Sequence, residues 1–144
     1  MKAYLAFYKH SGTWVDKIIR WGTSSKYSHV EIVVNELSEI HPVWYSSSPR
    51  DGGVRRMVRP VDTNRWDLFE VEIDEYTLNN HYYHKRGTGY DFLCIFFTHI
   101  LPLGIHSSVK EVCSEFCGAV MGKPSPHKYS PQGLYELVKD PLSN

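Results

Sequence analysis

The chain has no surplus of charge of either sign, which argues against a polyanion-binding protein. Lysine plus arginine and aspartate plus glutamate both total 16 in 144 residues, so the formal net charge is zero. A nucleic-acid-binding domain normally carries a clustered basic surplus. The nearest feature is the arginine-rich stretch 50–59, which Asp51 interrupts and which we interpret as the solvated face of a hairpin. We therefore expect no nucleic-acid partner.

The chain also has few cysteines and no long apolar run. Its three cysteines, Cys94, Cys113 and Cys117, are too few and too unevenly spaced for a disulfide framework, and an odd number suits a reducing compartment. The N-terminal segment lacks the apolar run and cleavage site of a signal peptide. The apolar stretch 92–105 is broken by polar residues, proline and glycine, and a membrane-spanning helix needs about 20 residues. We therefore expect a cytoplasmic protein without a membrane span.

Hydrophobic periodicity divides the chain into an N-terminal part rich in strands and a C-terminal part rich in helices. We predict strands at 3–8, 27–35, 39–46, 54–60 and 66–73, of which 27–35 is central and 66–73 is an edge or half-buried strand. We predict helices at 14–21, 76–86, 90–101, 112–121 and 132–138. Because no repeat or linker interrupts this order, we expect residues 1–144 to form a single α+β domain.

Cys113 is the first candidate for a chemical role. If the predicted helix begins near Val112, the Cys113 thiol lies in its first turn, where free N–H groups and the helix dipole stabilise a thiolate. Cys117 lies one turn further along the same face, away from the favourable end of the dipole, so we assign it to packing. The alternative is that both thiols are buried small apolar groups, the commonest fate of free cysteine.

His29 is the candidate base, because it stands against a run of β-branched core residues and a buried imidazole needs a partner for each ring nitrogen. Two residues are candidates for orienting it. His41 lies 12 residues later and can face His29 across an antiparallel pair, whereas Glu31 shares the strand face of His29. The alternatives are a satisfied core histidine at His29 and a solvated strand carboxylate at Glu31.

A zinc site is a weaker hypothesis for the same side chains. His29, His41, Cys113 and Cys117 contain two thiols and two imidazoles, but no Cys-x2-Cys or His-x3-His pair occurs among them. We therefore expect neither a metal nor another cofactor.

Taken in order, these motifs resemble the circularly permuted, NlpC-type papain-like cysteine hydrolases. The family pattern is a Tyr-Ser-His-Val strand, a polar residue about a dozen positions on, a Gly-Val-Arg strand, a Tyr-Asp pair and a Cys-Ser-Glu motif that opens a helix. The chain supplies Tyr27-Ser28-His29-Val30, His41, Gly53-Val54-Arg55, Tyr90-Asp91 and Cys113-Ser114-Glu115. The histidine precedes the cysteine, the reverse of the papain order, and the correspondence spans about residues 12 to 140.

The resemblance implies a permuted papain-like fold, with an antiparallel sheet or small barrel packed against helices. It implies that Cys113 is the nucleophile, His29 the base and His41 the orienting residue, at a position where many relatives have glutamate. A histidine there resembles the lecithin retinol acyltransferase-like branch. The backbone N–H of Cys113 would stabilise the oxyanion. The residues that flank the motifs are candidates for the substrate cleft, with Tyr27 also a candidate oxyanion donor: Tyr27, Ser28, Tyr90 and Ser114.

The implied function is hydrolysis of an amide bond, as in a peptide or cell-wall peptide, or of an ester bond, through a thioacyl intermediate. The compact chain resembles stand-alone bacterial or phage members. Two other functions stay open. One is a catalytically silent domain of the same fold that binds a protein partner through Trp44, Tyr45 and the hairpin 50–59. The other is a lipid-directed thiol acyltransferase, which the lack of a C-terminal membrane anchor disfavours.

Overall fold

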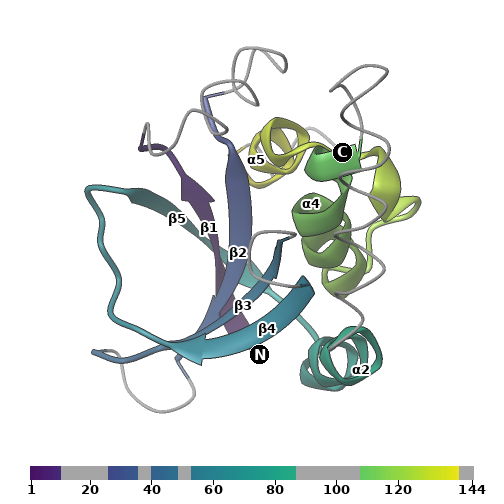
Figure 1. Cartoon of the computed structure of the whole chain (residues 1–144), viewed down its shortest axis with the longest axis horizontal. Coiled ribbons are helices and arrows are strands. Elements are labelled where there is room, and N and C mark those ends of the chain that lie inside the picture. Colours follow the sequence, from purple (N-terminus) through teal and green to yellow (C-terminus); the bar gives the residue numbers. More distant parts are fainter. Residues whose placement is uncertain (11–25, 36–39, 49–52, 87–107, 140–144) are drawn as a thin grey trace.

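Five strands and three α-helices make up the part of the chain that the computed structural model describes, which is residues 1–10, 26–35, 40–48, 53–86 and 108–139 (Figure 1). The strands are β1 (Lys2–Tyr8), β2 (His29–Val34), β3 (Val43–Ser48), β4 (Gly53–Val58) and β5 (Trp66–Glu72). The helices are α2 (Glu75–Lys85), α4 (Ser108–Val120) and α5 (Pro131–Lys139), with a 3-10 turn η2 (Pro126–Lys128). The predicted helices at 14–21 and 90–101 lie outside the described residues.

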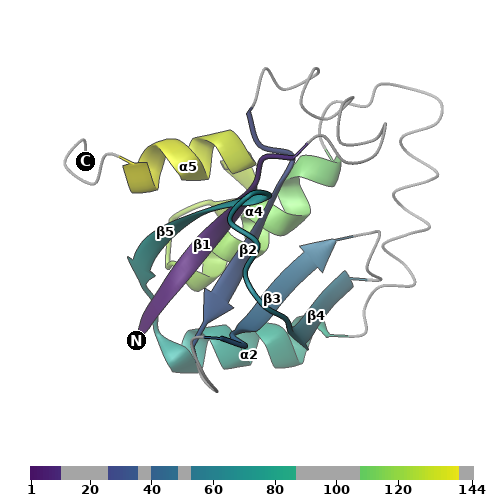
Figure 2. The same cartoon turned by 90° about the vertical axis from the view of Figure 1, so that its left-hand side faces the viewer.

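The strands form one antiparallel sheet in the order β4-β3-β2-β1-β5. The predicted central position of β2 and the edge position of β5 are both confirmed. Strands precede residue 74 and α-helices follow it in the described residues, so the α+β class is also confirmed. Figure 2 shows the sheet from the face opposite α4, so that α4 lies behind β2 and α2 runs across the lower end of the strands.

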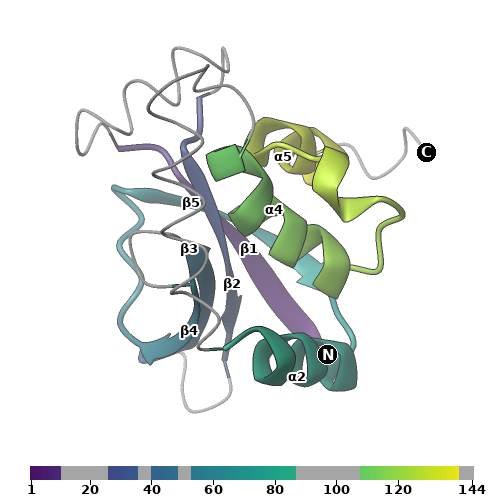
Figure 3. The ribbon, with the colours of Figure 1, turned by 45° about the vertical axis from the view of Figure 1, so that its right-hand side comes forward.

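Both faces of the sheet are covered by apolar side chains. Along β2, the alternating residues Val30, Ile32 and Val34 face the main core, where the helices pack (Figure 3). Val33 belongs to a second cluster on the opposite face. The second cluster consists of Ala6, Val33, Trp44 and Trp66, with partly buried neighbours from β1, β4 and β5 around them. A strand buried on both faces explains the near-continuous run of valine and isoleucine in β2.

The end of α4 is set by a glycine. Gly122 has a φ of 67°, and its N–H donates to the Ala119 carbonyl at 3.0 Å, while the Lys123 N–H donates to the Gly118 carbonyl at 2.9 Å. This pair of hydrogen bonds around a left-handed residue is the Schellman motif. The sequence prediction that Gly122 stops this helix is therefore confirmed.

Two predicted boundaries differ from the structure by four residues. The strand predicted at 39–46 is observed as β3 (Val43–Ser48), and the helix predicted at 112–121 is observed as α4 (Ser108–Val120). Both differences bear on the site described below. Within the described segments, no helix is both long and apolar enough to span a membrane.

We predict that alanine has opposite effects at two glycines. Gly122→Ala should lower the free energy of unfolding by about 1 kcal/mol, because a residue with a Cβ resists the left-handed region. Gly133→Ala should not destabilise α5 and should add a few tenths of a kcal/mol, because the new Cβ would meet Ser130 Oγ at an ordinary 3.6 Å. Urea unfolding of both variants tests this, and destabilisation by Gly133→Ala would contradict it.

Candidate active site

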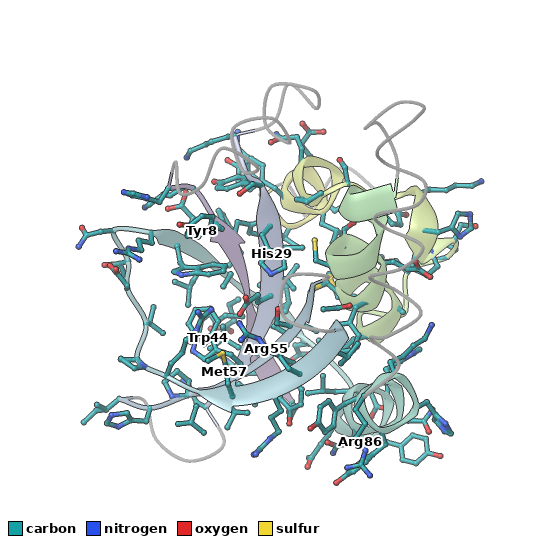
Figure 4. The ribbon with its side chains drawn as sticks, in the orientation of Figure 1. Tyr8, His29, Trp44, Arg55, Met57 and Arg86 are labelled. Atoms are coloured by element: carbon teal, nitrogen blue, oxygen red, sulfur yellow. The ribbon has the colours of Figure 1, made fainter. Side chains whose placement is uncertain are left out.

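The site lies where the ladder between β2 and β3 stops. The paired residues of β2 and β3 extend from Val34 opposite Val43 to Ile32 opposite Tyr45. The residues of β2 before Ile32 are not paired with β3. His29 begins β2, three residues before Ile32, and α4 packs against this strand. Figure 4 shows His29 on β2 between α4 and a group formed by Trp44, Arg55 and Met57. The start of β2 therefore has a helix beside it where a fully paired strand would have β3.

Two thiols of α4 contact the backbone of Val30. The Val30 N–H is a hydrogen-bond donor to the Cys113 sulfur, and Cys117 Sγ donates to the Val30 carbonyl oxygen at 3.9 Å. The two side chains are 3% and 1% exposed, so this edge of β2 is closed to water. Because Cys113 and Cys117 are one helical turn apart, a single face of α4 serves both backbone groups.

His29 is held by partners from three elements. Its Nε2 lies 3.1 Å from Oε1 of Glu31 on the same strand and 3.3 Å from Oγ of Ser46 on β3. The Cys113 sulfur of α4 also acts on the imidazole and raises its pKa. Its side chain is 15% exposed, so these contacts lie in a mostly dry environment. The structure thus brings together Cys113, His29 and Glu31.

The electrostatics of this group favour a thiolate beside an imidazolium. Burial would lower the pKa of His29, but the adjacent Cys113 sulfur and the Glu31 carboxylate outweigh it and raise that pKa to about 10. Burial would also raise the pKa of Cys113, but His29 and the backbone N–H groups of Val30 and Ser114 lower it overall. The charged pair is therefore favoured from the lowered thiol pKa up to about pH 10.

Glu31 is an ionised carboxylate although its side chain is only 3% exposed. Burial works to raise its pKa, but hydrogen bonding to His29 and the positive charges of His29, Arg59 and Arg55 lower the pKa overall. Arg59 Nη2 lies 2.7 Å from Glu31 Oε2, so each carboxylate oxygen has its own cationic partner. The hypothesis of a solvated carboxylate at Glu31 is wrong, and its alternative role, an acid in contact with His29, fits the geometry.

Cys117 differs from Cys113 in its surroundings. Burial, together with the negative charges of Cys113 and Glu31, raises the pKa of Cys117 well above its usual value. A neutral thiol donating to a carbonyl is a packing group, as expected from its place in the helix. Cys94 lies outside the described residues.

The structure does not bring His41 to His29, which corrects the first choice of orienting residue. His41 is exposed and precedes β3. The register places Val43 opposite Val34, at the far end of β2 from His29. The five residue-to-residue steps from His29 to Val34 span roughly 16 Å of extended strand. The predicted pairing assumed a short hairpin, and the later start of β3 removes it. The same separation breaks up the proposed zinc set.

Cys113 does not lie in the first turn of its helix, which corrects a second prediction. With α4 beginning at Ser108, Cys113 is its sixth residue. A backbone N–H at that position follows the i→i−4 pattern of the helix. The helix start on which the oxyanion role of the Cys113 N–H was predicted is therefore not observed. The neighbouring His29 and the Val30 and Ser114 backbone N–H groups, rather than a helix start, account for the lowered pKa of the Cys113 thiol.

The four residues predicted to line a substrate cleft differ in burial and hydrogen bonding. Tyr27 is buried and its hydroxyl donates to Asp67 Oδ2 at 2.8 Å, so its proton is not aimed at an oxyanion. Ser114 is buried and donates to the Tyr129 carbonyl, which ties α4 to the segment before α5. Ser28 is 7% exposed, and its hydroxyl has no hydrogen-bond partner among the described residues. Tyr90 lies outside the described residues.

Sequence reasoning missed Ser46 and Arg59. Ser46 was predicted as the end of a strand, with no role, and Arg59 as part of a solvated hairpin face. That interpretation is wrong for Arg59, which is bonded to Glu31. The proposed protein-binding surface is wrong in part as well, because Trp44 and Tyr45 are 0% and 2% exposed. The available signal was Glu31 inside a run of core-type valine and isoleucine residues, because a carboxylate buried in such a strand requires a cation from another element.

Comparisons with protein-family models, with curated proteins and with solved structures found no match to this chain.

We predict that Glu31 and His41 affect the titration of His29 unequally. Glu31→Gln removes a carboxylate that raises the pKa of His29, so this pKa should fall below about 10. His41→Gln should leave it unchanged, because His41 lies beyond the opposite end of β2. NMR titration of the imidazole, assigned with a His29→Gln variant, measures both. An equal effect of the two changes would contradict the placement of Glu31.

Proposed function

We propose that the chain is a cysteine-nucleophile hydrolase that cleaves an amide bond, as in a peptide, or an ester bond. The observation that carries the proposal is the placement of His29, whose Nε2 lies 3.1 Å from the Glu31 carboxylate and whose pKa is raised by the adjacent Cys113 sulfur. A nucleophile, a base and a group that orients the base are the three parts of a catalytic triad. We also propose that the fold is the permuted papain-like fold. The antiparallel sheet, the histidine on a central strand and the cysteine on a packed helix support this.

The roles follow from the contacts. The Nε2–H of His29 donates to Glu31, so Nδ1 is the ring nitrogen that exchanges a proton with the Cys113 thiol. Glu31 stays ionised and fixes the tautomer. In this assignment Glu31 takes the orienting role that the family resemblance gave to His41. Ser46 supports the same nitrogen from β3.

The proposed reaction has two halves. The Cys113 thiolate attacks the carbonyl carbon, a C–S bond forms and the carbonyl electron pair moves to oxygen. As the oxyanion collapses, the C–N or C–O bond breaks and the His29 imidazolium gives its proton to the leaving group. Water then attacks the thioester carbon while His29 takes one of its protons, the C–S bond breaks, and the acid is released with the Cys113 thiolate and the His29 imidazolium restored. The Ser28 hydroxyl, buried directly before His29, is a candidate contact for the substrate carbonyl.

The rival functions have less support. The protein-binding surface built on Trp44 and Tyr45 is buried, and the histidine that linked the chain to the acyltransferase branch, His41, is not in the triad. An acyltransferase would use the same thioester but transfer it to an acceptor other than water. The first half-reaction is therefore the step to test.

We predict that Cys113 alone becomes acylated by p-nitrophenyl acetate. The wild type should release about one equivalent of nitrophenolate in a burst and gain one acetyl group on Cys113, because a thiolate is a better nucleophile than a thiol near neutral pH. Cys113→Ala should lose the burst and keep the fold by circular dichroism. Cys117→Ala should keep the burst and cost about 1 kcal/mol of stability. A full burst in Cys113→Ala would remove the mechanism.

A further inference from the structure

Arg59 is a cation held by several contacts beside the candidate site. It follows the end of β4, and its Nη2 lies 2.7 Å from Glu31 Oε2. Its guanidinium carbon lies 4.0 Å from the centroid of the Trp44 ring and 5.0 Å from that of Trp66. Both distances are within the range of a cation–π interaction. Arg59 is thus held by a carboxylate and two indole rings that belong to three different strands.

The backbone of Arg59 is fixed as well. Its carbonyl oxygen accepts a hydrogen bond from Trp44 Nε1 at 2.9 Å, and its N–H donates to the Pro42 carbonyl at 3.4 Å. Because the same Trp44 carries the guanidinium on its ring and binds the Arg59 carbonyl, the side chain has little freedom to leave Glu31. A residue held from both ends is suited to fix the position of its partner.

The division of the Glu31 carboxylate is the central observation. Oε1 faces His29 and Oε2 faces Arg59. A buried carboxylate with His29 as its only cation would depend on the imidazolium for charge balance and would hold the proton that the thiol chemistry must move. Arg59 does not exchange protons in this pH range, so it balances Glu31 in every protonation state of His29.

We propose that Arg59 is a positioning residue of the Cys113–His29 site, which holds the Glu31 carboxylate against Nε2 of His29 and balances its charge. The inference rests on the proposed function, because it assigns Arg59 a role in that reaction. Arg59 does not touch the reacting atoms. It acts through Glu31, and the role predicts effects on the pH dependence of the thiol that a purely structural residue would not have.

Other charged groups also face the site. Arg55, on β4 opposite Ser46, adds a positive charge that acts on Glu31. Cys117 of α4 is neutral at working pH because its pKa is raised by burial. Removing the charge of Arg59 therefore leaves the positive charge of Arg55 acting on Glu31. Loss of any cation raises the pKa of each neighbouring acid, so Arg59→Met should make the Cys113 thiol harder to ionise.

The test is iodoacetamide alkylation of Cys113, followed by mass spectrometry between about pH 5 and 9. Arg59→Met should slow alkylation near pH 6.5 by roughly three- to tenfold, the effect of one charge in a partly buried site. Arg59→Lys keeps the charge but not the planar stacked guanidinium, so it should recover part of the loss and fall between Arg59→Met and wild type. Arg56→Met is the matched control, because Arg56 contacts the Tyr45 hydroxyl at 3.2 Å. It should keep the wild-type profile.

A second measurement asks whether Arg59 acts through Glu31. In p-nitrophenyl acetate turnover, Arg59→Met should lower kcat in the wild-type background and cause no further loss in a Glu31→Gln background. The double variant carries no uncompensated charge at this position. Its comparison with Glu31→Gln therefore still tests the role of Arg59 if Arg59→Met alone folds poorly.

The outcomes separate the two proposals. If wild-type Cys113 alkylates like an ordinary thiol, the proposed function fails and Arg59 has no reaction to serve. If wild-type Cys113 is activated but Arg59→Met keeps the wild-type profile, the hydrolase proposal stands and the role of Arg59 is overturned. Losses of kcat that multiply in the double variant would also overturn it, because they would show that Arg59 acts independently of Glu31.

Discussion

The site depends on one break in a hydrogen-bonded ladder. In a continuous antiparallel pair, the N–H and carbonyl of Val30 would face β3, but the pairing of β2 with β3 ends at Ile32. Buried backbone groups need partners, and here the thiols of Cys113 and Cys117 supply them. A sulfur is a weak partner when neutral, and an ionised sulfur is a stronger acceptor for the Val30 N–H. The break therefore both places the helix and favours the thiolate.

The same break determines where His29 stands. Continuing the register would put Ser48 opposite His29, whereas the imidazole contacts Ser46, two residues away along β3. A diagonal neighbour of this kind is within reach of a long side chain across a strand pair. The imidazole thus contacts Glu31 of its own strand and Ser46 of the neighbouring strand, beside the Cys113 sulfur that raises its pKa.

The sequence predicted the elements better than the distances between them. Strand alternation, the central place of β2 and the glycine that ends α4 were all readable from local patterns. The choice between Glu31 and His41 was not, because it depends on register, and a strand that begins four residues later moves its partner to the other end of the sheet. The prediction that placed Cys113 at a helix start failed because the helix extends back to Ser108. The Ser108-x-x-Glu111 capping pattern was the available signal for that start, and the prediction did not use it.

Charge balance links the stability of this site to its chemistry. With the thiol ionised and the imidazole protonated, Cys113, His29, Glu31 and Arg59 carry two negative and two positive charges, which sum to zero. Burying a balanced set costs far less than burying any member alone. Neutralising the thiol and the imidazole together leaves Glu31 and Arg59 as a balanced pair 2.7 Å apart. Proton transfer between Cys113 and His29 therefore leaves the net charge of the buried group unchanged. The protonation states of the pair can then change during a reaction without burying an unbalanced charge among the surrounding strands.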